Sequence, residues 1–488
     1  MRLSPLSSSF TRKVDVVLKS LAATVFALVV FISAAYFITG EAWAQSLPGG
    51  SNGADVIACS PAPCVLPPTN ATQGRNAVSA PIVADPADRA HLIVGSQAVC
   101  GQSGLAFWVT TDAGSTWSET CMSPITYEGN EYAPDGATLT GPNLGYDRHG
   151  NAYIAGFYAY DGSGNPEAGF QGFQKYTAGG GWSAPAVALI DKGEPFDPWY
   201  CWLSVDTNGA SPYADSVYIS CVLVGPLTYD NETQAVVSHS NDGGATWQQV
   251  AVAPLHHYPE YDASTAMAVG KDGTVYLTWQ YSDSKTFGPS DVVFSKSSDG
   301  GNTWSKPTVV APVTQIYYVP NTGDLSVLDT PAIAVDNSDG SHAGNLYVVM
   351  YNWTGTFMQV QVVRSADGGD TWSRPVPVAP PSDTHDQFLP WISVGPTGLV
   401  GVSWLDRRND PANVDYQAFA GISANGGLSF ENVQLTTGFS SLNNQYDGSQ
   451  IGSYTGDTWD GPNYFIAAWM DDSNGQYMED YVGGIRLK

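Results

Sequence analysis

"SSDGGNTWS", Ser297–Ser305, is a short phrase that this chain repeats. Close copies begin at Thr110 ("TTDAGSTWS"), Ser240 ("SNDGGATWQ") and Ser365 ("SADGGDTWS"). A glycine in each copy can supply the positive φ of a tight turn, and an aspartate can accept backbone N–H groups across that turn. A tryptophan then follows where a strand resumes. The phrase therefore serves a β-hairpin. The aspartates predicted to have this structural role are Asp112, Asp242, Asp299 and Asp367.

A second hairpin pattern alternates with the phrase, which also has two degraded copies, from Tyr176 and Ser423. In this pattern two apolar strands flank a turn rich in Asp, Asn and Gly. One unit of two hairpins has four short strands and about 60 residues, the size of a propeller blade with long loops. The segments with the second pattern are Ala80–Gly95, Leu144–Tyr158, Trp202–Cys221, Ala266–Trp279, Ala332–Met350, Trp391–Trp404 and Ile451–Trp469.

The last unit is incomplete, because only "DYVGGIRLK" follows its first hairpin and the chain ends at Lys488. Its missing outer strand is expected to come from Cys64–Ser79, since closing a ring removes exposed sheet edges. The sequence therefore predicts an all-β fold. It is a single β-propeller over residues 62–488 with seven four-stranded blades, the N-terminal strand closing the last one. A six-bladed ring with a C-terminal appendage is the alternative.

Residues 1–44 have the pattern of an export signal. Basic residues precede an apolar run, Leu21–Ile38, and the small residues Ala42 and Ala44 follow, so cleavage is expected after Ala44. An uncleaved membrane anchor is the alternative, because the run is long for a signal peptide. Residues 45–61 then form a linker. The protein is expected to be periplasmic, secreted or on the cell surface, with no membrane insertion once the signal is removed.

All six cysteines follow the expected cleavage site, and an even number in an exported chain indicates disulfides. Neighbours would pair most simply, as Cys59–Cys64, Cys100–Cys121 and Cys201–Cys221, but other connectivities are open. The formal net charge is -27, which repels nucleic acid and anionic membranes. No organic cofactor is expected, whereas a structural calcium ion held by clustered aspartates is left open.

The repeated phrase resembles the Asp-box, or BNR, repeat of the sialidase superfamily, and the resemblance covers most of the chain after residue 61. It implies a propeller whose repeated turns lie on one face and whose opposite rim holds the ligand. It also implies a sialidase-like glycoside hydrolase of exo-sialidase type, which after export would act on extracellular glycans. The protein is expected to be a monomer. The alternative is a noncatalytic surface propeller that binds glycan or glycoprotein. The family's first-blade arginine is absent from "SAPIVAD", and its three-arginine clamp has no clear counterpart.

Loops that lead into the innermost strands are rich in acids and polar aromatics. Sialidases use a tyrosine as the nucleophile, a glutamate that activates it and an aspartate that acts as the acid. The segment "LHHYPEYDAS" contains these three residue types close together, so Tyr258, Glu260 and Asp262 are predicted to be catalytic. Solvated loop acids and packing tyrosines are the alternative interpretation. The adjacent His256 and His257 are not expected to bind a metal, because neighbouring strand residues point apart.

Arg407 and Arg408 form a basic pair in a chain with few arginines. A guanidinium can grip a carboxylate with two hydrogen bonds, which suits ligand binding. Alternatively, the pair holds its own loop by binding nearby aspartates. The residues predicted to bind substrate are Arg407, Arg408, Asp406, Asp386 and Tyr446.

Overall fold

Antiparallel hairpins make up the part of the chain that the computed structural model describes. This part comprises residues 62–100, 103–135, 141–160, 169–178, 180–190, 196–225, 232–283, 288–316, 318–322, 327, 330–443, 451–452 and 454–488. It contains strands and no helix. The chain divides into two units, Met1–Glu41 and Ala42–Lys488, and every described residue belongs to the second. The predicted signal and linker, residues 1–61, lie outside the described residues.

Six sheets are each formed by one continuous stretch of chain. The first contains β2 (Ile82–Ala84), β3 (Leu92–Cys100), β4 (Ser103–Thr110) and β5 (Ser118–Cys121). The second contains β6 (Ile125–Tyr127), β7 (Asn130–Pro134), β8 (Asn143–Tyr146), β9 (Ala152–Tyr160), β10 (Phe170–Thr177), β11 (Gly181–Trp182) and β12 (Ala186–Leu189). The third contains β13 (Asp197–Val205), β14 (Val217–Val224), β15 (Thr233–Ser240) and β16 (Gln248–Ala251).

The next three sheets repeat this order. One contains β17 (Tyr261–Val269), β18 (Val275–Ser282), β19 (Pro289–Ser297) and β20 (Thr308–Thr314). Another contains β21 (Ala332–Val335), β22 (Leu346–Trp353), β23 (Met358–Ser365) and β24 (Val376–Pro377). The last contains β25 (Gln387–Val394), β26 (Val400–Asp406), β27 (Asp415–Ser423), β28 (Glu431–Gln434) and the short β29 (Ser440–Ser441).

A further sheet, the closing sheet, joins both ends of the described chain. Its strands are β30 (Gly456–Asp460), β31 (Tyr464–Asp471), β32 (Glu479–Arg486) and β1 (Cys64–Asn70). β1 pairs antiparallel with β32, from Cys64 opposite Arg486 to Asn70 opposite Tyr481. The Asn70 amide also donates to Glu479 Oε1 at 2.6 Å. The N-terminal strand thus covers an edge that would otherwise be open.

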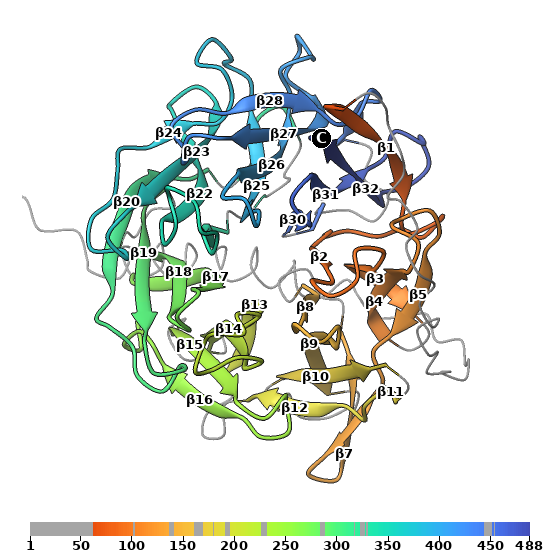
Figure 1. Cartoon of the computed structure of the whole chain (residues 1–488), viewed down its shortest axis with the longest axis vertical. Helices are drawn as coiled ribbons and strands as arrows, with labels where there is room; N and C mark the ends of the chain where they lie inside the picture. Colours follow the sequence, from red (N-terminus) through yellow and green to blue (C-terminus); the bar gives the residue numbers. More distant parts are fainter. Residues whose placement is uncertain are drawn as a thin grey trace, which may run out of the picture. The chain divides into compact units, whose positions relative to one another are not determined.

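The innermost strands of all these sheets form a closed circle (Figure 1), in which each contacts the next. The order around the circle is β2, β8, β13, β17, β21, β25 and β30, with β30 returning to β2. Aromatic rings fill its centre: the Trp202 ring centroid lies 4.1 Å from that of Trp391 and 5.9 Å from that of Tyr454. The Tyr454 hydroxyl donates to the carbonyl of Cys201 at 3.3 Å. These three rings pack strands from distant parts of the sequence against one another.

The prediction of an all-β propeller is confirmed. The six sheets of continuous chain agree with the six-bladed alternative rather than with seven equal units, because the last unit has no repeated turn of its own. Two of the simplest disulfides are also confirmed, Cys100–Cys121 and Cys201–Cys221. Cys59, the predicted partner of Cys64, lies outside the described residues.

The aspartates of the repeated phrase lock their turns as the residue types predict. In all four copies one carboxylate oxygen accepts the N–H of the threonine that follows, at 2.8–2.9 Å, and the other accepts that threonine's hydroxyl. Hydrogen bonds from Thr246 lower the pKa of Asp242 to about 2. The degraded copy that begins at Ser423 keeps one of these two hydrogen bonds, since Asn425 Oδ1 accepts the Ser429 N–H at 3.1 Å.

The second glycine of the phrase lets neighbouring sheets approach closely. A Cβ at Gly244 would lie 2.1 Å from the ring of Phe173 in the preceding sheet, and one at Gly369 would lie 2.3 Å from Phe294. The tryptophans that follow pack edge-on against the same rings: Trp247 lies 5.0 Å from Phe173 and Trp372 5.4 Å from Phe294. The phrase therefore builds both the turn and the contact between sheets.

Candidate functional site

The segment Leu255–Glu260 enters β17 at one rim of the ring. Because β17, β18 and β19 run antiparallel in sequence order, this rim lies at the end opposite the repeated turn that follows β19. The rim site comprises the side chains that this segment brings together with the end of β18: His256, Tyr258, Glu260, Asp262 and Tyr281. Three of these are the residues predicted to be catalytic.

A β-bulge recurs near the start of three innermost strands and aligns the repeats. The register shifts in β13, β17 and β25. In each bulge one non-glycine residue has a left-handed φ: Tyr200 at 51°, Ser264 at 49° and Leu389 at 48°. Bulges of this kind re-aim side chains and are common beside functional sites. Aligned on the bulge, Asp262 takes the place of Gln387.

Asp262 and Gln387 make the same contact between sheets. Asp262 Oδ2 accepts the N–H of Ala235 on β15 at 3.3 Å, and Gln387 Oε1 accepts the N–H of Val360 on β23 at 3.0 Å. An uncharged amide is thus sufficient for this contact. The charge of Asp262, which is only 2% exposed, needs a different explanation, because burying a carboxylate is costly unless it is paired.

His256 supplies that explanation. Its Nδ1 lies 3.0 Å from Asp262 Oδ2. The hydrogen bond to Asp262 raises the pKa of His256 against the opposing effect of burial. Since Nδ1 is engaged, Nε2 is the ring nitrogen left for proton transfer, and the carboxylate fixes the tautomer and orientation of the ring.

The end of β18 also departs from its repeats. In two other sheets a tryptophan Nε1–H donates to the aspartate two residues later, Trp404 to Asp406 at 2.6 Å and Trp469 to Asp471 at 3.2 Å. In β18 the corresponding residue is Tyr281, so Trp279 donates instead to Asp262 Oδ1 at 2.8 Å. At this position the rim site therefore differs from the two other sheets that have the tryptophan.

Tyr281 stands at the position of Asp406 and Asp471 in the two other sheets, and its ring packs against His256. Its ring centroid is 4.9 Å from that of His256. Burial raises the pKa of Tyr281, and the nearby carboxylates of Glu260 and Asp283 raise it further. Tyr258 is 57% exposed, and Glu260 is also exposed. The site thus combines an oriented histidine with exposed acidic and phenolic groups.

Asp406 and Arg408, both predicted to bind substrate, are engaged with each other. Arg408 Nη2 lies 2.6 Å from Asp406 Oδ2, and its Nε lies 3.2 Å from Asp383. Its guanidinium carbon stands 4.3 Å from the centroid of the Phe419 ring. These contacts correspond to the alternative interpretation, in which the basic pair holds its own loop.

Arg407 and Asp386 form a completely buried pair, with Arg407 Nη1 3.3 Å from Asp386 Oδ2. Asp386 also accepts the Asn413 amide at 2.7 Å, and Arg407 donates to the carbonyl of Pro320 at 2.6 Å. Both side chains are 0% exposed, so neither meets solvent in this structure. Tyr446, the remaining predicted binding residue, lies outside the described residues.

The described arginines do not gather at the rim site. Those that bind residues of other sheets are Arg75, Arg89, Arg148 and Arg364. Within the described ranges there is also no group of three or more His, Cys, Asp or Glu side chains that could hold a metal ion. The described part contains no helix long and apolar enough to cross a bilayer.

The sequence prediction named three residues of the rim site but not their neighbours Trp279 and Tyr281. The roles of Trp279 and Tyr281 become visible only when the hairpins are aligned on their bulges. A signal was present in the sequence: "TWQY" stands where the two other sheets have "SWLD" and "AWMD".

The chain was compared with protein families and with curated proteins. No protein-family model matches the chain. A xyloglucanase of Paenibacillus sp. is 26% identical over 312 residues, which cover 62% of this chain and 26% of that protein. The chain thus spans about a quarter of the length of this curated relative.

Among solved structures, an ulvan lyase of polysaccharide lyase family PL25 is similar with a TM-score of 0.50 and 13% identity, over 85% of this chain and 95% of that one. A sialidase of Trypanosoma rangeli in complex with sialic acid is similar with a TM-score of 0.43 and 12% identity, over 75% and 56%.

Proposed function

We propose that this protein acts on extracellular glycans as a glycoside hydrolase and that the rim site is its active site. The observation that carries the proposal is the pairing of His256 with the buried carboxylate of Asp262. Trp279 fixes that carboxylate, and Tyr281 stands where two other sheets have an aspartate. The relative named as a xyloglucanase supports a glycan as the ligand.

The proposed reaction uses the two groups that can exchange protons at the rim. Protonated His256, oriented by Asp262, donates from Nε2 to the glycosidic oxygen as the C1–O bond breaks. Water forms the new bond to C1, and Glu260 accepts the proton that this water releases. Tyr258 offers an exposed ring and hydroxyl beside them. Asp262 is in this proposal a positioning residue, because its carboxylate is already occupied by Trp279, Ala235 and His256.

The proposed substrate is a neutral glycan rather than a sialoside. A sialic acid carboxylate needs cationic partners, but Arg407 is buried against Asp386 and Arg408 is held by Asp406. The formal net charge of -27 also repels anionic polymers. The same reasoning disfavours acidic polysaccharides as substrates.

Purified protein should therefore release reducing ends from xyloglucan or arabinan and leave sialyllactose intact. His256→Gln should lower kcat/KM about 100-fold or more, as expected for loss of general acid–base catalysis. The matched control is His385→Gln, because His385 Nδ1 also lies 3.0 Å from an aspartate oxygen, that of Asp383. Equal loss in both variants, or turnover of sialyllactose alone, contradicts the proposal. Binding of neutral glycans without any turnover identifies the noncatalytic alternative.

We also propose that the pairing of β1 with β32 keeps the ring closed and that the repeated turns are Asp-boxes. The closed circle of innermost strands supports the first, and the conserved hydrogen bonds of the four aspartates support the second. Removal of residues 62–70 should expose the edge of β32 and cause aggregation. An unchanged monomer with unchanged thermal stability contradicts this assignment.

Export is proposed from the N-terminal pattern together with the disulfides Cys100–Cys121 and Cys201–Cys221, because such bonds persist in oxidising compartments. N-terminal sequencing of the secreted protein should begin at Gln45. Recovery of an intact N-terminus in the membrane fraction favours the anchor instead.

A further inference from the structure

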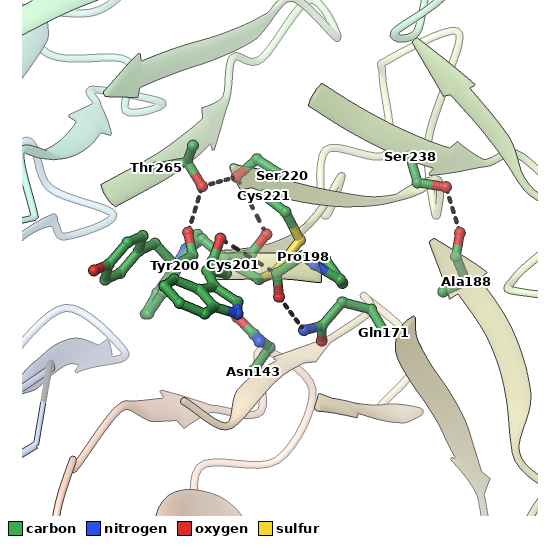
Figure 2. The surroundings of a disulfide bond; sticks show 12 residues. Asn143, Gln171, Ala188, Pro198, Tyr200, Cys201, Ser220, Cys221, Ser238 and Thr265 are labelled. Atoms are coloured by element: carbon green, nitrogen blue, oxygen red, sulfur yellow. Dashed lines mark hydrogen bonds between the residues drawn. A yellow bond between two sulfur atoms is a disulfide. The ribbon is translucent and has the colours of Figure 1, made fainter. Parts of the chain in front are cut away.

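A groove lies between two sheets, away from the rim site. It has a volume of 460 Å³, within the range of about 300–1,000 Å³ that is usual for ligand sites. Its lining comes from β12 and Ile190, from β15, from Trp247 and the start of β16, and from Tyr127 of β6. Figure 2 shows how the walls are joined: the Ser238 hydroxyl donates to the carbonyl of Ala188.

The β6–β7 hairpin that carries Tyr127 is an addition to the four-stranded repeat. It pairs through β7 with β9, from Tyr132 opposite Tyr160 to Pro134 opposite Tyr158. Figure 1 shows β7 extending beyond the other strands of the ring. The added hairpin thus supplies one of the side chains that line the groove.

Two aromatic rings line the groove, and both are held in place. Trp247 packs against Phe173 at 5.0 Å and donates its Nε1–H to the carbonyl of Gly244 at 3.1 Å. Tyr127 packs against Phe170 at 5.6 Å and Tyr132 at 6.4 Å. Neither ring is fully buried. Such rings lose little conformational freedom when a ligand covers them.

The lining carries no charge. It consists of these two rings, the apolar Val187, Ala188 and Ile190, and the polar Ser238 and Gln249. Gln249 is exposed and offers both hydrogen-bond donors and an acceptor. The exposed Glu128 lies beside the Tyr127 hydroxyl: burial raises the pKa of that tyrosine, and Glu128 raises it further. Negative charge at the edge disfavours an anionic ligand.

From this combination we infer that the groove is a second glycan-binding site, which takes a neutral polysaccharide chain. Sugar rings present apolar C–H faces that pack on aromatic rings, and their hydroxyls bond to amide and phenol groups. A hydrophobic peptide segment would fill the apolar walls but would leave the role of Gln249 and the Tyr127 hydroxyl unexplained. The site would keep the protein on its polymer, whether or not the rim site cleaves that polymer.

Affinity gel electrophoresis tests the inference on the full-length secreted protein, with xyloglucan, arabinan or galactomannan in the gel and polygalacturonate as the anionic comparison. His256→Gln serves as the background, so that a change in turnover cannot imitate a change in binding. Tyr127→Ala and Gln249→Ala should each weaken binding to a neutral polymer about fivefold to tenfold. Polygalacturonate should not retard the protein.

A matched control is Trp372→Ala, compared with Trp247→Ala. Trp372 packs against Phe294 with the same interplanar angle of 73° as Trp247 against Phe173, but it does not line the groove. Only Trp247→Ala should lose retardation, although both variants lose a similar packing contact. The inference is overturned if no neutral polymer retards the background protein, if Tyr127→Ala binds normally, or if both tryptophan variants lose binding equally.

Discussion

His256 and Asp262 form a hydrogen-bonded pair at the start of β17, with Nδ1 and Oδ2 3.0 Å apart. Asp262 is at the same time fixed by Trp279 through its other oxygen at 2.8 Å. An aspartate held on both sides cannot swing toward a ligand. Asp262 therefore fixes the position of His256 and raises its pKa. This effect should be measurable in the pH dependence of kcat/KM.

Asp262→Asn should move the alkaline limb of the pH–kcat/KM profile to lower pH. The hydrogen bond to Asp262 raises the pKa of His256 above its ordinary value of 6.5, so wild-type His256 keeps its proton to higher pH. Stability from this pair is full below the unfolded-state pKa and is lost as pH rises through the folded-state pKa. The asparagine variant removes the charge and keeps an acceptor. An unmoved limb, measured on the same neutral glycan, contradicts the role of His256 as the acid.

Burial of Asp457 predicts a second pH-dependent change in the free energy of unfolding. Burial raises its pKa to about 7, against hydrogen bonds from Ser393 and Ser403. The unfolded chain releases this proton near pH 4, whereas the folded chain keeps it, so wild-type stability should fall as pH rises from about 4 to about 7. The loss is at most on the order of 4 kcal/mol. Urea unfolding of Asp457→Asn at several pH values should show a flatter profile, and parallel profiles contradict the assignment.

Gly244→Ala should be more destabilising than Gly355→Ala, although both positions have left-handed φ values, +94° and +99°. The added methyl group at Gly244 meets the ring of Phe173, whereas nothing lies within 4 Å at Gly355. Strain alone costs about 1–2 kcal/mol, and overpacking adds about 1–3 kcal/mol. Urea midpoints with constant m-values measure the difference. Equal losses would mean that the glycine serves only the turn.

Arg407→Met should destabilise the fold by about 3–5 kcal/mol, because it leaves the buried Asp386 without its cation. Burial lowers the pKa of Arg407 against the opposing charge of Asp386, as expected for a desolvated pair. The double variant Arg407→Met, Asp386→Leu should recover part of the loss. A raised KM with unchanged thermal stability would instead restore Arg407 to the substrate-binding role predicted from the sequence.

The sequence by itself determined the repeat, its turns and its closure. Gly244 and Asp242 act within a few residues of each other, so their spacing in the sequence already specifies a turn. The length of the last unit likewise required a strand from the N-terminal side, and β1 supplies it. Local geometry and the need to cover sheet edges are properties that a sequence pattern can express.

Only the tertiary structure decided what the rim residues do. Asp262 was predicted to be catalytic and Arg407 to bind substrate, yet Trp279 and Asp386 of their own hairpins engage both side chains. Each side chain also bonds to a backbone group outside its hairpin, the Ala235 N–H and the Pro320 carbonyl. A carboxylate or guanidinium reads the same in a sequence whether it faces solvent or a buried partner. Burial and pairing depend on strand register and on how neighbouring sheets pack, and only the folded chain fixes both.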